Sequence, residues 1–579
     1  ARQHRTRAPL GAVLRENGLI DDATLARALS RQWNIGLVDL ASAPPAQALL
    51  AEVQLQKCLR VLCIPWRQFA GRTIVVVADP GEAARALDAC GLTPETAIIA
   101  LAPAQEIRAS LEARFEDELE CDARMQTPAD LSCRGWSGRK VQWIAAAFLT
   151  SLLVLAVLWP LGALTAVFGW ALIANLVTAL FRLTVLTARF WPERTTAPAL
   201  SPGVEKLADH RSLPVVSLMI PLHREDRVLP ALLKHLGQLD YPRECLDIKL
   251  LIEEHDNFTL DALDKLELVA HVEVVRVPDN TLKTKPRALN YGLNFCKGDI
   301  VGILDAEDRP HRDQINAVIR NLHEAPPDVA CVQGMLDFYN PRHNWLSRCF
   351  TVEYAIWFNV LLRGMRRLNL PVPLGGTSVY FRRPVLESLC GWDAHNVTED
   401  ADLGMRIARY GYRTEILPST TMEEANSAFV PWIKQRSRWL KGYLITWAVH
   451  MRNPVTLFQD LGLFGFLTFQ IIFLGGVTAY LSIPLFWMMW IGILGFDLGT
   501  FLGGGLFWPI ALSSLFLGQF VMLAVAVTAC ARPGKWWLLA WLPTLFLYWP
   551  IGALATFQAI GDLVTDPFYW DKTSHGDFT

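Results

Sequence analysis

Three groups of residues in the middle of the chain combine residue types and spacings that suit catalysis. The first group is Asp305, Glu307 and Asp308, which directly follows an apolar segment. Three neighbouring carboxylates repel one another unless a cation neutralises them. Carboxylate oxygens are ligands that Mg²⁺ and Mn²⁺ prefer, usually together with substrate phosphates. The group therefore predicts a divalent-metal site, with a solvated acidic turn as the alternative interpretation.

The second group is Thr398, Glu399 and Asp400, at the start of a segment with helical periodicity. Thr398 is suited to cap that helix, which would leave Asp400 directed into a cleft as a general base for an incoming hydroxyl. Acidic residues in a first helical turn also complement the helix dipole without any catalytic role. Both interpretations stay open on this segment alone.

The third group is Gln435, Arg438 and Trp439, in an amphipathic, basic and aromatic stretch over 427–455. One interpretation is a helix on a membrane surface, with Arg and Lys side chains that reach the polar interface. The other places Arg438 on a diphosphate and Trp439 against the apolar face of a sugar ring. The two are compatible, because one helix can lie at an interface and still cover an active site.

The segments around these groups favour an α/β domain over residues 200–425. Four short apolar segments predict strands, at 215–222, 247–254, 272–278 and 299–308. Helical stretches separate them, and this alternation predicts a mostly parallel sheet. Ligands of such sheets bind beyond the carboxyl ends of the strands, where the acidic residues lie.

Uncharged apolar segments on both sides of this domain predict a membrane protein. The region 141–182 is interrupted at Pro160, and a single span needs ~20 apolar residues, so the region predicts a hairpin of two spans. Basic residues flank the hairpin on both sides, which predicts that both of its ends face the cytoplasm. A second amphipathic stretch, 344–367, predicts an interfacial helix between the α/β domain and the bilayer.

The C-terminal region 458–561 predicts four more spans. Two of them are expected from 461–496, because that segment is too long for one span and contains Pro484. The even total returns the tail, 562–579, to the cytoplasm, on the same side as both soluble domains.

Composition excludes several classes of protein. Hydrophobic residues make up 52% of the 579 residues, which fits a chain that is part membrane and part globular. The formal net charge of −2 leaves no global field for nucleic acid, so no nucleic-acid partner is expected. The 11 cysteines are scattered without a CxxC pair, which argues against a disulfide framework or a zinc site and favours a reducing compartment. The basic N-terminal residues lack a following apolar core, so no secretory signal is expected.

The N-terminal region, residues 1–135, predicts a small α/β domain. Leu10, Leu14, Leu25 and Leu29 share an apolar stripe over a helical segment at 9–32. Further along, 72–80 predicts a strand that ends in a turn, and 103–115 predicts another helix.

The three catalytic groups, in this order and ahead of several membrane helices, resemble the processive family 2 glycosyltransferases, which include cellulose, hyaluronan and curdlan synthases. The resemblance covers roughly 200–560. It implies a GT-A-type α/β domain embedded between transmembrane helices of the bacterial inner membrane. It also implies an inverting enzyme that polymerises a nucleotide sugar, UDP-glucose by preference, into an exported β-linked exopolysaccharide.

The resemblance assigns roles to individual residues. Asp400, beside Glu399, would deprotonate the glycan acceptor, and Asp305 with either Glu307 or Asp308 would hold Mg²⁺ or Mn²⁺. Residues expected to contact the substrates are Glu225, Glu253, Glu254, Lys285, Asp305, Gly375, Gly376, Thr377, Ser378, Gln435, Arg438 and Trp439. Glu253 and Glu254 stand where the family usually has two Asp residues that contact the nucleotide base.

The N-terminal pattern LG-x-x-L-x-x-x-G-L, followed by Gln32 and VVVADP, resembles the N-terminal domain of type II secretion ATPases. Some of those domains bind cyclic di-GMP through this motif. The resemblance implies a regulatory site at Arg7, Leu10, Gly11, Gly18 and Gln32, although Pro9 stands where the family has Arg. A packing or oligomerisation domain is the alternative.

Other functions remain open at this stage. The nearest alternative is a non-processive transferase that glycosylates a lipid carrier. A membrane receptor or scaffold with a degenerate transferase fold is a further alternative, against which the intact acids Asp305 and Asp400 argue. A transporter is disfavoured, because the spans carry almost no ionisable residues along a substrate path.

Overall fold

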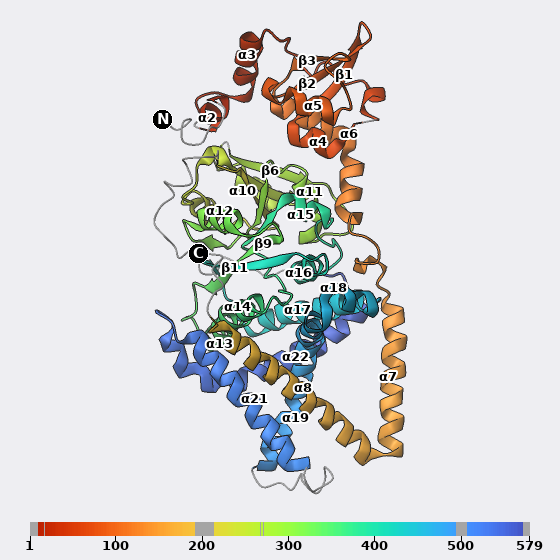
Figure 1. Cartoon of the computed structure of the whole chain (residues 1–579), viewed down its shortest axis with the longest axis vertical. Helices are drawn as coiled ribbons and strands as arrows, with labels where there is room; N and C mark the ends of the chain where they lie inside the picture. The colour runs from red at the N-terminus through yellow and green to blue at the C-terminus, as the bar shows by residue number, and fades with distance from the viewer. Residues whose placement is uncertain are drawn as a thin grey trace.

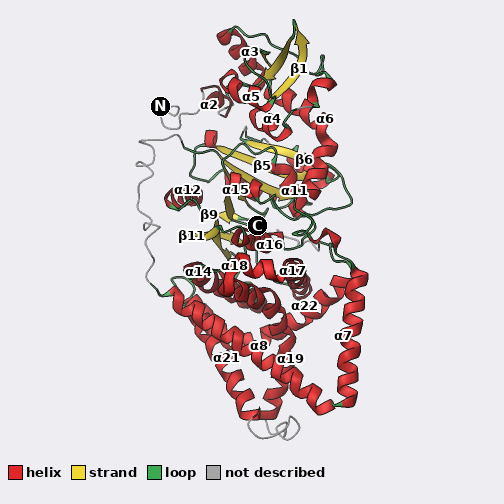
Figure 2. Ribbon diagram, turned by 45° about the vertical axis from the view of Figure 1, so that its right-hand side comes forward, coloured by secondary structure: helices red, strands yellow, loops and turns green. Residues whose placement is uncertain are grey.

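The computed structural model describes residues 10–16, 18–51, 53–191, 213–266, 268–269, 271–493 and 507–570. These residues form three parts that follow one another along the long axis of the molecule (Figure 1). A small N-terminal domain lies at one end, an α/β domain lies in the middle, and a helical bundle lies at the other end. Figure 2 shows that the strands are confined to the first two parts.

The N-terminal domain is built on a three-stranded sheet. Its strands are β1 (Cys63–Phe69), β2 (Arg72–Val77) and β3 (Ala97–Leu101), with β1 antiparallel and β3 parallel to β2. The helices are α2 (Leu10–Glu16), α3 (Asp22–Trp33), α4 (Leu55–Val61), α5 (Ala83–Ala89) and α6 (Ala104–Met125). The predicted strand and the later helix are confirmed. The predicted helix at 9–32 is divided into α2 and α3, because Gly18 takes a φ of +67° that ends the first helix.

Helix α6 connects the N-terminal domain to the middle domain. Asn290 of the middle domain donates to the Ala123 carbonyl at 2.9 Å, and Asn280 donates to Glu120 at 2.6 Å. The helix packs along α11 (Lys285–Leu293). The position of α6 on the middle domain is fixed by these two hydrogen bonds, because a buried amide or carboxylate that lost its partner would destabilise the fold.

An eight-stranded sheet in the order β6-β5-β4-β7-β10-β9-β11-β8 forms the core of the middle domain. The strands are β4 (Val216–Leu222), β5 (Leu246–Glu253), β6 (Val272–Val277), β7 (Ile300–Ile303), β8 (Arg309–Pro310), β9 (Val329–Phe338), β10 (Val379–Arg382) and β11 (Arg413–Glu423). The four predicted strands are confirmed. The sheet is mostly parallel, as predicted, but two of its eight strands run the other way: β10 is antiparallel to β7 and β9, and β8 is antiparallel to β11.

Helices cover both faces of this sheet, which explains why β5 and β9 are buried along their whole length. Alternate residues of β4 enter different cores: Leu218 packs in the cluster that contains Leu232, whereas Met219 packs in the cluster that contains Leu289. The helices are α9 (Leu229–Leu236), α10 (Asn257–Leu263), α11, α12 (Gln314–Glu324), α15 (Arg383–Ser388) and α16 (Glu399–Arg409).

A layer of helices lies between the sheet and the bundle (Figure 1). It contains α13 (Trp345–Ile356), a π-helical turn (Trp357–Leu361), α14 (Leu362–Arg367) and α17 (Phe429–His450). These helices occupy the predicted interfacial stretches 344–367 and 427–455. One face of α13 packs on the sheet domain and the other on the bundle, so the layer is buried on both sides.

Five helical segments are long and apolar enough to cross a membrane among the described residues. The bundle contains α7 (Gly138–Leu158), α8 (Pro160–Arg189), α18 (Pro454–Phe469), a π-helical segment (Gln470–Gly475), α19 (Gly476–Ile493), α21 (Phe507–Cys530), a 3-10 segment (Trp536–Thr544) and α22 (Leu545–Thr565). The break at Pro160 is confirmed. The two spans predicted from 461–496 are wrong, because Pro484 lies inside α19 and Pro454–Trp490 is one candidate segment.

The last candidate segment begins and ends beside the middle domain. At its start, Lys535 donates to Asp337, at the end of β9, at 2.8 Å. At its end, Trp136 donates to the Leu563 carbonyl at 3.1 Å, and Ser437 of α17 donates to Asp562 at 3.3 Å. In Figure 1, α7, α8, α19 and α21 are the labelled helices that extend to the far end of the bundle. The chain after α22 therefore returns to the middle domain.

Candidate active site

A cavity of about 1000 Å³ lies between the sheet, α17 and the segment after α22. The predicted residues that line it are Glu225, Glu253, Lys285, Asp305, Glu307, Gly375, Gly376, Thr377, Glu399, Asp400, Gln435, Arg438 and Trp439. The fold thus brings all three sequence groups to one site. Three of the predicted substrate or metal contacts do not line the cavity: Glu254, Asp308 and Ser378.

The acidic group after β7 is held by a network of hydrogen bonds. Lys285, the first residue of α11, donates to the Asp305 carboxylate and, at 3.0 Å, to the Gly376 carbonyl. The Asp305 amide donates to Asp308 at 2.8 Å, and Thr377 also donates to Asp308. Asp308 therefore braces the turn from beneath, while Asp305 and Glu307 face the cavity. Of the two alternatives for a second metal contact, this geometry favours Glu307.

Burial raises the pKa of several carboxyl groups in this acidic group. Burial and the neighbouring Asp305 raise the pKa of Glu307 to about 8. Burial and the charges of Asp305 and Glu307 hold the pKa of Asp308 well above its usual range. Glu423, the last residue of β11, lines the same cavity, and burial followed by the charge of Asp308 raises its pKa well above the usual range too.

The carboxylates fit a divalent cation. Among the described residues, Oδ1 of Asp308 and Oε1 of Glu423 are buried oxygens without a hydrogen-bond donor. Buried acceptors without donors are rare in folded proteins unless a water or an ion completes them. Hard oxygen donors of this kind match Mg²⁺ or Mn²⁺. Glu423 was missed from the sequence. The local sequence gives no clear signal for it, because RTEILPSTTMEE (413–424) does not alternate between apolar and polar residues.

Asp400 lies against the backbone of the glycine loop. Gly376 has a φ of +79°, and a methyl group added there would lie 2.9 Å from Oδ2 of Asp400. Burial raises the pKa of Asp400 above its usual value. Burial and the charge of Asp400 raise the pKa of the adjacent Glu399 to about 8. The raised pKa of Glu399 favours its protonated form at neutral pH, which removes a like charge from beside Asp400.

Buried polar contacts fix the helix that carries these acids. Arg406 donates to Asp402 at 2.9 Å, and His450 of α17 lies 3.0 Å from the other oxygen of Asp402. The side chain of Asn396 donates to Thr446, also on α17, at 2.9 Å. The predicted capping role of Thr398 is wrong, because its side chain makes no capping hydrogen bond. The ties to α17 hold α16 in its place.

Helix α17 places a cation and an aromatic ring in the cavity. Arg438 is half-buried next to Glu399 and Asp400, and the loss of solvent lowers the pKa of its guanidinium. The neighbouring Trp439 ring lies 6.4 Å from the Tyr354 ring. Gln435 accepts a hydrogen bond from Asn426 at 3.5 Å. Gln435, Arg438 and Trp439, the residues of this helix that are predicted to contact the sugar and the diphosphate, therefore all line the cavity.

The segment after α22 contributes residues that were missed from the sequence. Phe568, Tyr569 and Trp570 line the cavity. The guanidinium of Arg438 lies 4.6 Å from the centroid of the Trp570 ring, a cation–π distance. Lys441 of α17 donates to the Tyr569 carbonyl at 3.0 Å. No sequence signal apart from the three aromatic residues pointed to this role. The rest of the tail, 571–579, lies outside the described residues.

The remaining predicted residues lie elsewhere. Ser378 is buried beneath the loop, where its hydroxyl lies 2.8 Å from that of Thr421, and Glu254 is exposed. Leu10, Gly18 and Gln32 are exposed on the N-terminal helices, and Gly11 packs against Leu25. Arg7 lies outside the described residues. None of the four described N-terminal residues lines the cavity.

A second cavity, of about 370 Å³, leads from Asp400 into the helical bundle. Its lining is rich in aromatic residues, among them Trp357, Trp487, Trp490 and Trp549. Its polar part includes an ion pair in which Arg436 donates to Glu353 at 2.5 Å. Tyr548 also donates to Glu353, at 2.5 Å. Asp400, Gly375 and Trp439 line both cavities and so mark the passage between them.

Comparison with known protein families identifies the class of both soluble parts. Residues 300–551 match the family described as glycosyl transferase family group 2, and residues 33–120 match the MshEN domain. The chain therefore contains a family 2 glycosyltransferase domain with a GT-A-like α/β fold, which confirms the predicted class. An MshEN domain precedes it, which confirms the resemblance to the N-terminal domain of type II secretion ATPases. The matched MshEN range begins after the predicted regulatory residues.

Similar proteins belong to the same class. A probable glycosyltransferase of Bacillus subtilis, YdaM, is 29% identical over 40% of this chain and 56% of its own. The beta-monoglucosyldiacylglycerol synthase of Synechocystis is 28% identical over 52% of this chain and 62% of its own. The chain thus spans about three fifths of each relative. A mannosyltransferase of Pyrobaculum calidifontis, in complex with GDP-Man and Mn²⁺, superposes with a TM-score of 0.43 at 20% identity, over 70% of this chain and 99% of that one.

Proposed function

We propose that the chain is a membrane-embedded, inverting glycosyltransferase that moves glucose from UDP-glucose to an acceptor held in the bundle. The observation that carries the proposal is the position of Asp400, which lines both the cavity over the sheet and the cavity that enters the bundle. A base at this passage meets a donor from one side and an acceptor from the other.

The donor would occupy the larger cavity. Glu253 lies at the carboxyl end of β5 and accepts from Arg287 at 2.5 Å, which suits contact with a nucleoside. Although burial opposes it, the charges of Asp305 and Glu399 raise the pKa of Lys285, so its ammonium stays charged. Lys285 and Arg438 would then stabilise the charge that develops on the departing diphosphate. A divalent cation at Asp305, Glu307 and Glu423 would neutralise the same diphosphate.

The proton of the acceptor would move to Asp400. The raised pKa of Asp400 makes its carboxylate a stronger base than an ordinary one, and the positive charges of Lys285 and Arg438 favour its ionised form. Attack by the hydroxyl on the side opposite the diphosphate inverts the anomeric centre. Gly376 leaves room for the acceptor, because it has no side chain beside the Asp400 carboxylate.

The acceptor would be a growing β-linked glycan that leaves through the bundle as an exopolysaccharide. Tryptophan rings stack on the apolar faces of sugars, and five of them, including Trp439 at the passage, line the second cavity. The buried Arg436 and Glu353 pair offers hydrogen-bonding groups to the hydroxyls of a sugar. These features support the polymer as the leading product.

A glycosylated lipid is the second candidate. The second cavity is lined mainly by apolar side chains between the membrane helices, which also suits an acyl or isoprenoid chain. The Synechocystis relative is named as a synthase of a glucosylated diacylglycerol. The size of the product separates the two candidates.

We further propose that the protein lies in the inner membrane of a bacterium with its catalytic and MshEN domains in the cytoplasm, and that cyclic di-GMP regulates it. The contact of α6 with the donor side supports a coupling of the two domains. Glu120 of α6 accepts from Asn280 at 2.6 Å and lies 3.8 Å from Arg287, which pairs with Glu253.

The test uses the full-length protein in lipid nanodiscs with Mg²⁺ or Mn²⁺. Radiolabelled UDP-glucose, UDP-N-acetylglucosamine and GDP-mannose are supplied in turn, with and without diacylglycerol and cyclic di-GMP. A labelled polymer that a linkage-specific β-glucanase degrades supports the leading product, and a labelled lipid supports the second. If no donor gives a labelled product with either ion, the proposed activity is wrong.

A further inference from the structure

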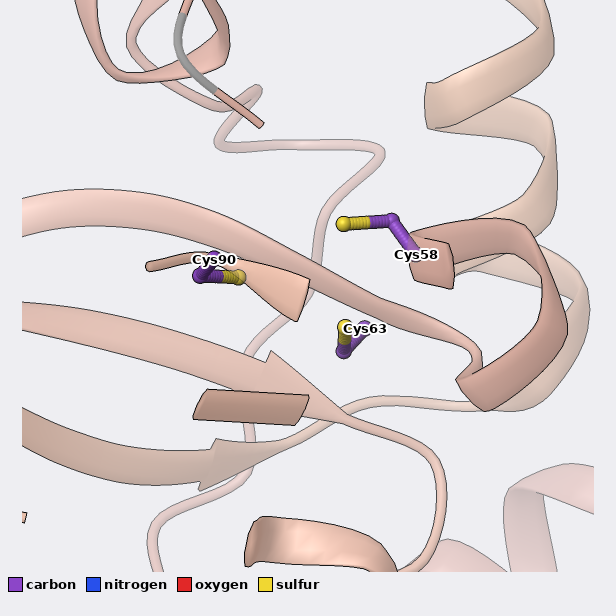
Figure 3. Close-up of side chains that lie close together, drawn as sticks. All are labelled: Cys58, Cys63 and Cys90. Atoms are coloured by element: carbon purple, nitrogen blue, oxygen red, sulfur yellow. The ribbon is translucent and has the colours of Figure 1, made fainter. Parts of the chain in front are cut away.

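Three cysteines that are far from the active site meet in the core of the N-terminal domain. Cys58 lies on α4, Cys63 begins β1, and Cys90 directly follows α5. Their sulfur atoms all lie within 4.8 Å of one another. Figure 3 shows the three sulfurs turned toward one shared space between these elements. These three cysteines, which are scattered in the sequence, are therefore gathered in the fold.

Local backbone geometry assembles the group. Leu62, between α4 and β1, takes a φ of +55°, which reverses the chain and brings Cys63 back under Cys58. The end of α5 then packs on α4, where the thiol of Cys58 lies 3.9 Å from the Ala89 carbonyl. A left-handed conformation costs a non-glycine residue ~1 kcal/mol, so the surrounding structure must hold it. The spacing in the sequence gives no sign of this, because no CxxC pair is involved.

We propose that Cys58, Cys63 and Cys90 bind one thiophilic metal ion, and that copper(I) is the ion that fits them. Three sulfur ligands without nitrogen or oxygen select soft ions. Within the described part of the chain, the group contains only these three cysteines and no His, Asp or Glu. Structural zinc sites close with four protein ligands, whereas copper(I) accepts three.

Burial supports the three-coordinate ion. Cys58 and Cys63 have no exposed surface, so a water molecule has little access as a fourth ligand. Cys90 is partly exposed and provides the path of entry. Cys90 would therefore be the first of the three ligands to meet the ion. Each further thiol that binds as a thiolate releases its proton to solvent.

The test measures copper(I) transfer to the reduced, full-length protein under anaerobic conditions, with a coloured copper(I)–bicinchoninate complex as the source. We expect one equivalent of copper(I) per chain. Replacement of any one of the three cysteines by serine is expected to raise the dissociation constant at least about tenfold. The matched control is Cys121→Ser, which changes an exposed cysteine of α6 and is expected to bind copper(I) like the wild type.

Two further measurements keep the test decisive if a serine variant unfolds. Copper(I) is expected to slow alkylation of Cys90 in the wild-type protein, as read by mass spectrometry, but not alkylation of Cys121. An equal amount of zinc(II), added to the copper(I)-loaded protein, is not expected to displace copper(I) and so is not expected to restore the alkylation of Cys90. The proposal is wrong if Cys90 stays equally reactive with copper(I), if the three variants bind like the wild type, or if zinc(II) displaces copper(I).

Discussion

Replacement of Gly376 by alanine tests whether the glycine loop positions the catalytic base. Gly376 has a φ of +79°, where an alanine costs ~1 kcal/mol of stability. The added methyl group would also lie 2.9 Å from Oδ2 of Asp400, whereas ordinary contact begins at 3.4 Å. The two groups must therefore separate by about 0.5 Å, which is the tolerance within which catalytic groups have to be held.

The expected result is a fall in the rate of sugar transfer of about 10- to 100-fold, because small displacements of a reacting group have costs of that order. Gly411→Ala is the matched control. Gly411 has a φ of +80°, and nothing lies within 4 Å of an added methyl group, so it carries the same backbone cost without the contact.

The assay compares initial rates of labelled-sugar transfer with the unfolding temperatures of both variants, followed by tryptophan fluorescence. Both are expected to lose a similar amount of stability, and only Gly376→Ala is expected to lose transfer. The reasoning is refuted if Gly376→Ala transfers sugar at the wild-type rate, or if Gly411→Ala is equally impaired.

Three further predictions concern the same cavity. Burial raises the pKa of Glu399 to about 8, so its carboxyl stays protonated up to that pH. Above pH 8 a second negative charge forms beside Asp400, and kcat/KM is expected to fall. If Glu399→Gln shows the same fall in kcat/KM above pH 8, the assignment to Glu399 is wrong. Glu423→Gln is expected to raise the Mn²⁺ concentration for half-maximal activity about 10- to 100-fold, and an unchanged titration would exclude Glu423 from the metal site. Trp570→Ala removes a ring 4.6 Å from Arg438 and is expected to raise the KM for the donor severalfold, whereas a change confined to stability would assign the ring a structural role.

The parts of the fold that follow from local periodicity could be predicted from the sequence. The apolar runs of β4 to β7 and the hairpin at Pro160 depend on residues within one segment, and both are confirmed. The error at Pro484 has a physical cause. A proline inside an apolar helix is tolerated when neighbouring helices pack around it, so it does not mark the end of a span.

The active-site residues could be predicted where the position of a residue at the end of a strand or the start of a helix decides where its side chain lies. Asp305 and Asp400 lie in one cavity, as their places at a strand end and a helix start suggested. The sequence did not show that Asp308 and Ser378 lie outside the cavity lining, because a shift of one residue in a turn decides which side chain faces the cavity. Glu423 and Trp570 reach the site only through long-range packing, which no local pattern records.

The central claim is that Asp400 takes the proton of the acceptor. The direct test is the rate of sugar transfer by full-length Asp400→Asn, which preserves the size of the side chain but removes the base. Its affinity for UDP is measured by calorimetry on the same sample. The rate is expected to fall by about 10³-fold with little change in UDP affinity, as is usual when a general base is lost. A variant that transfers sugar within a few-fold of the wild-type rate would contradict this account.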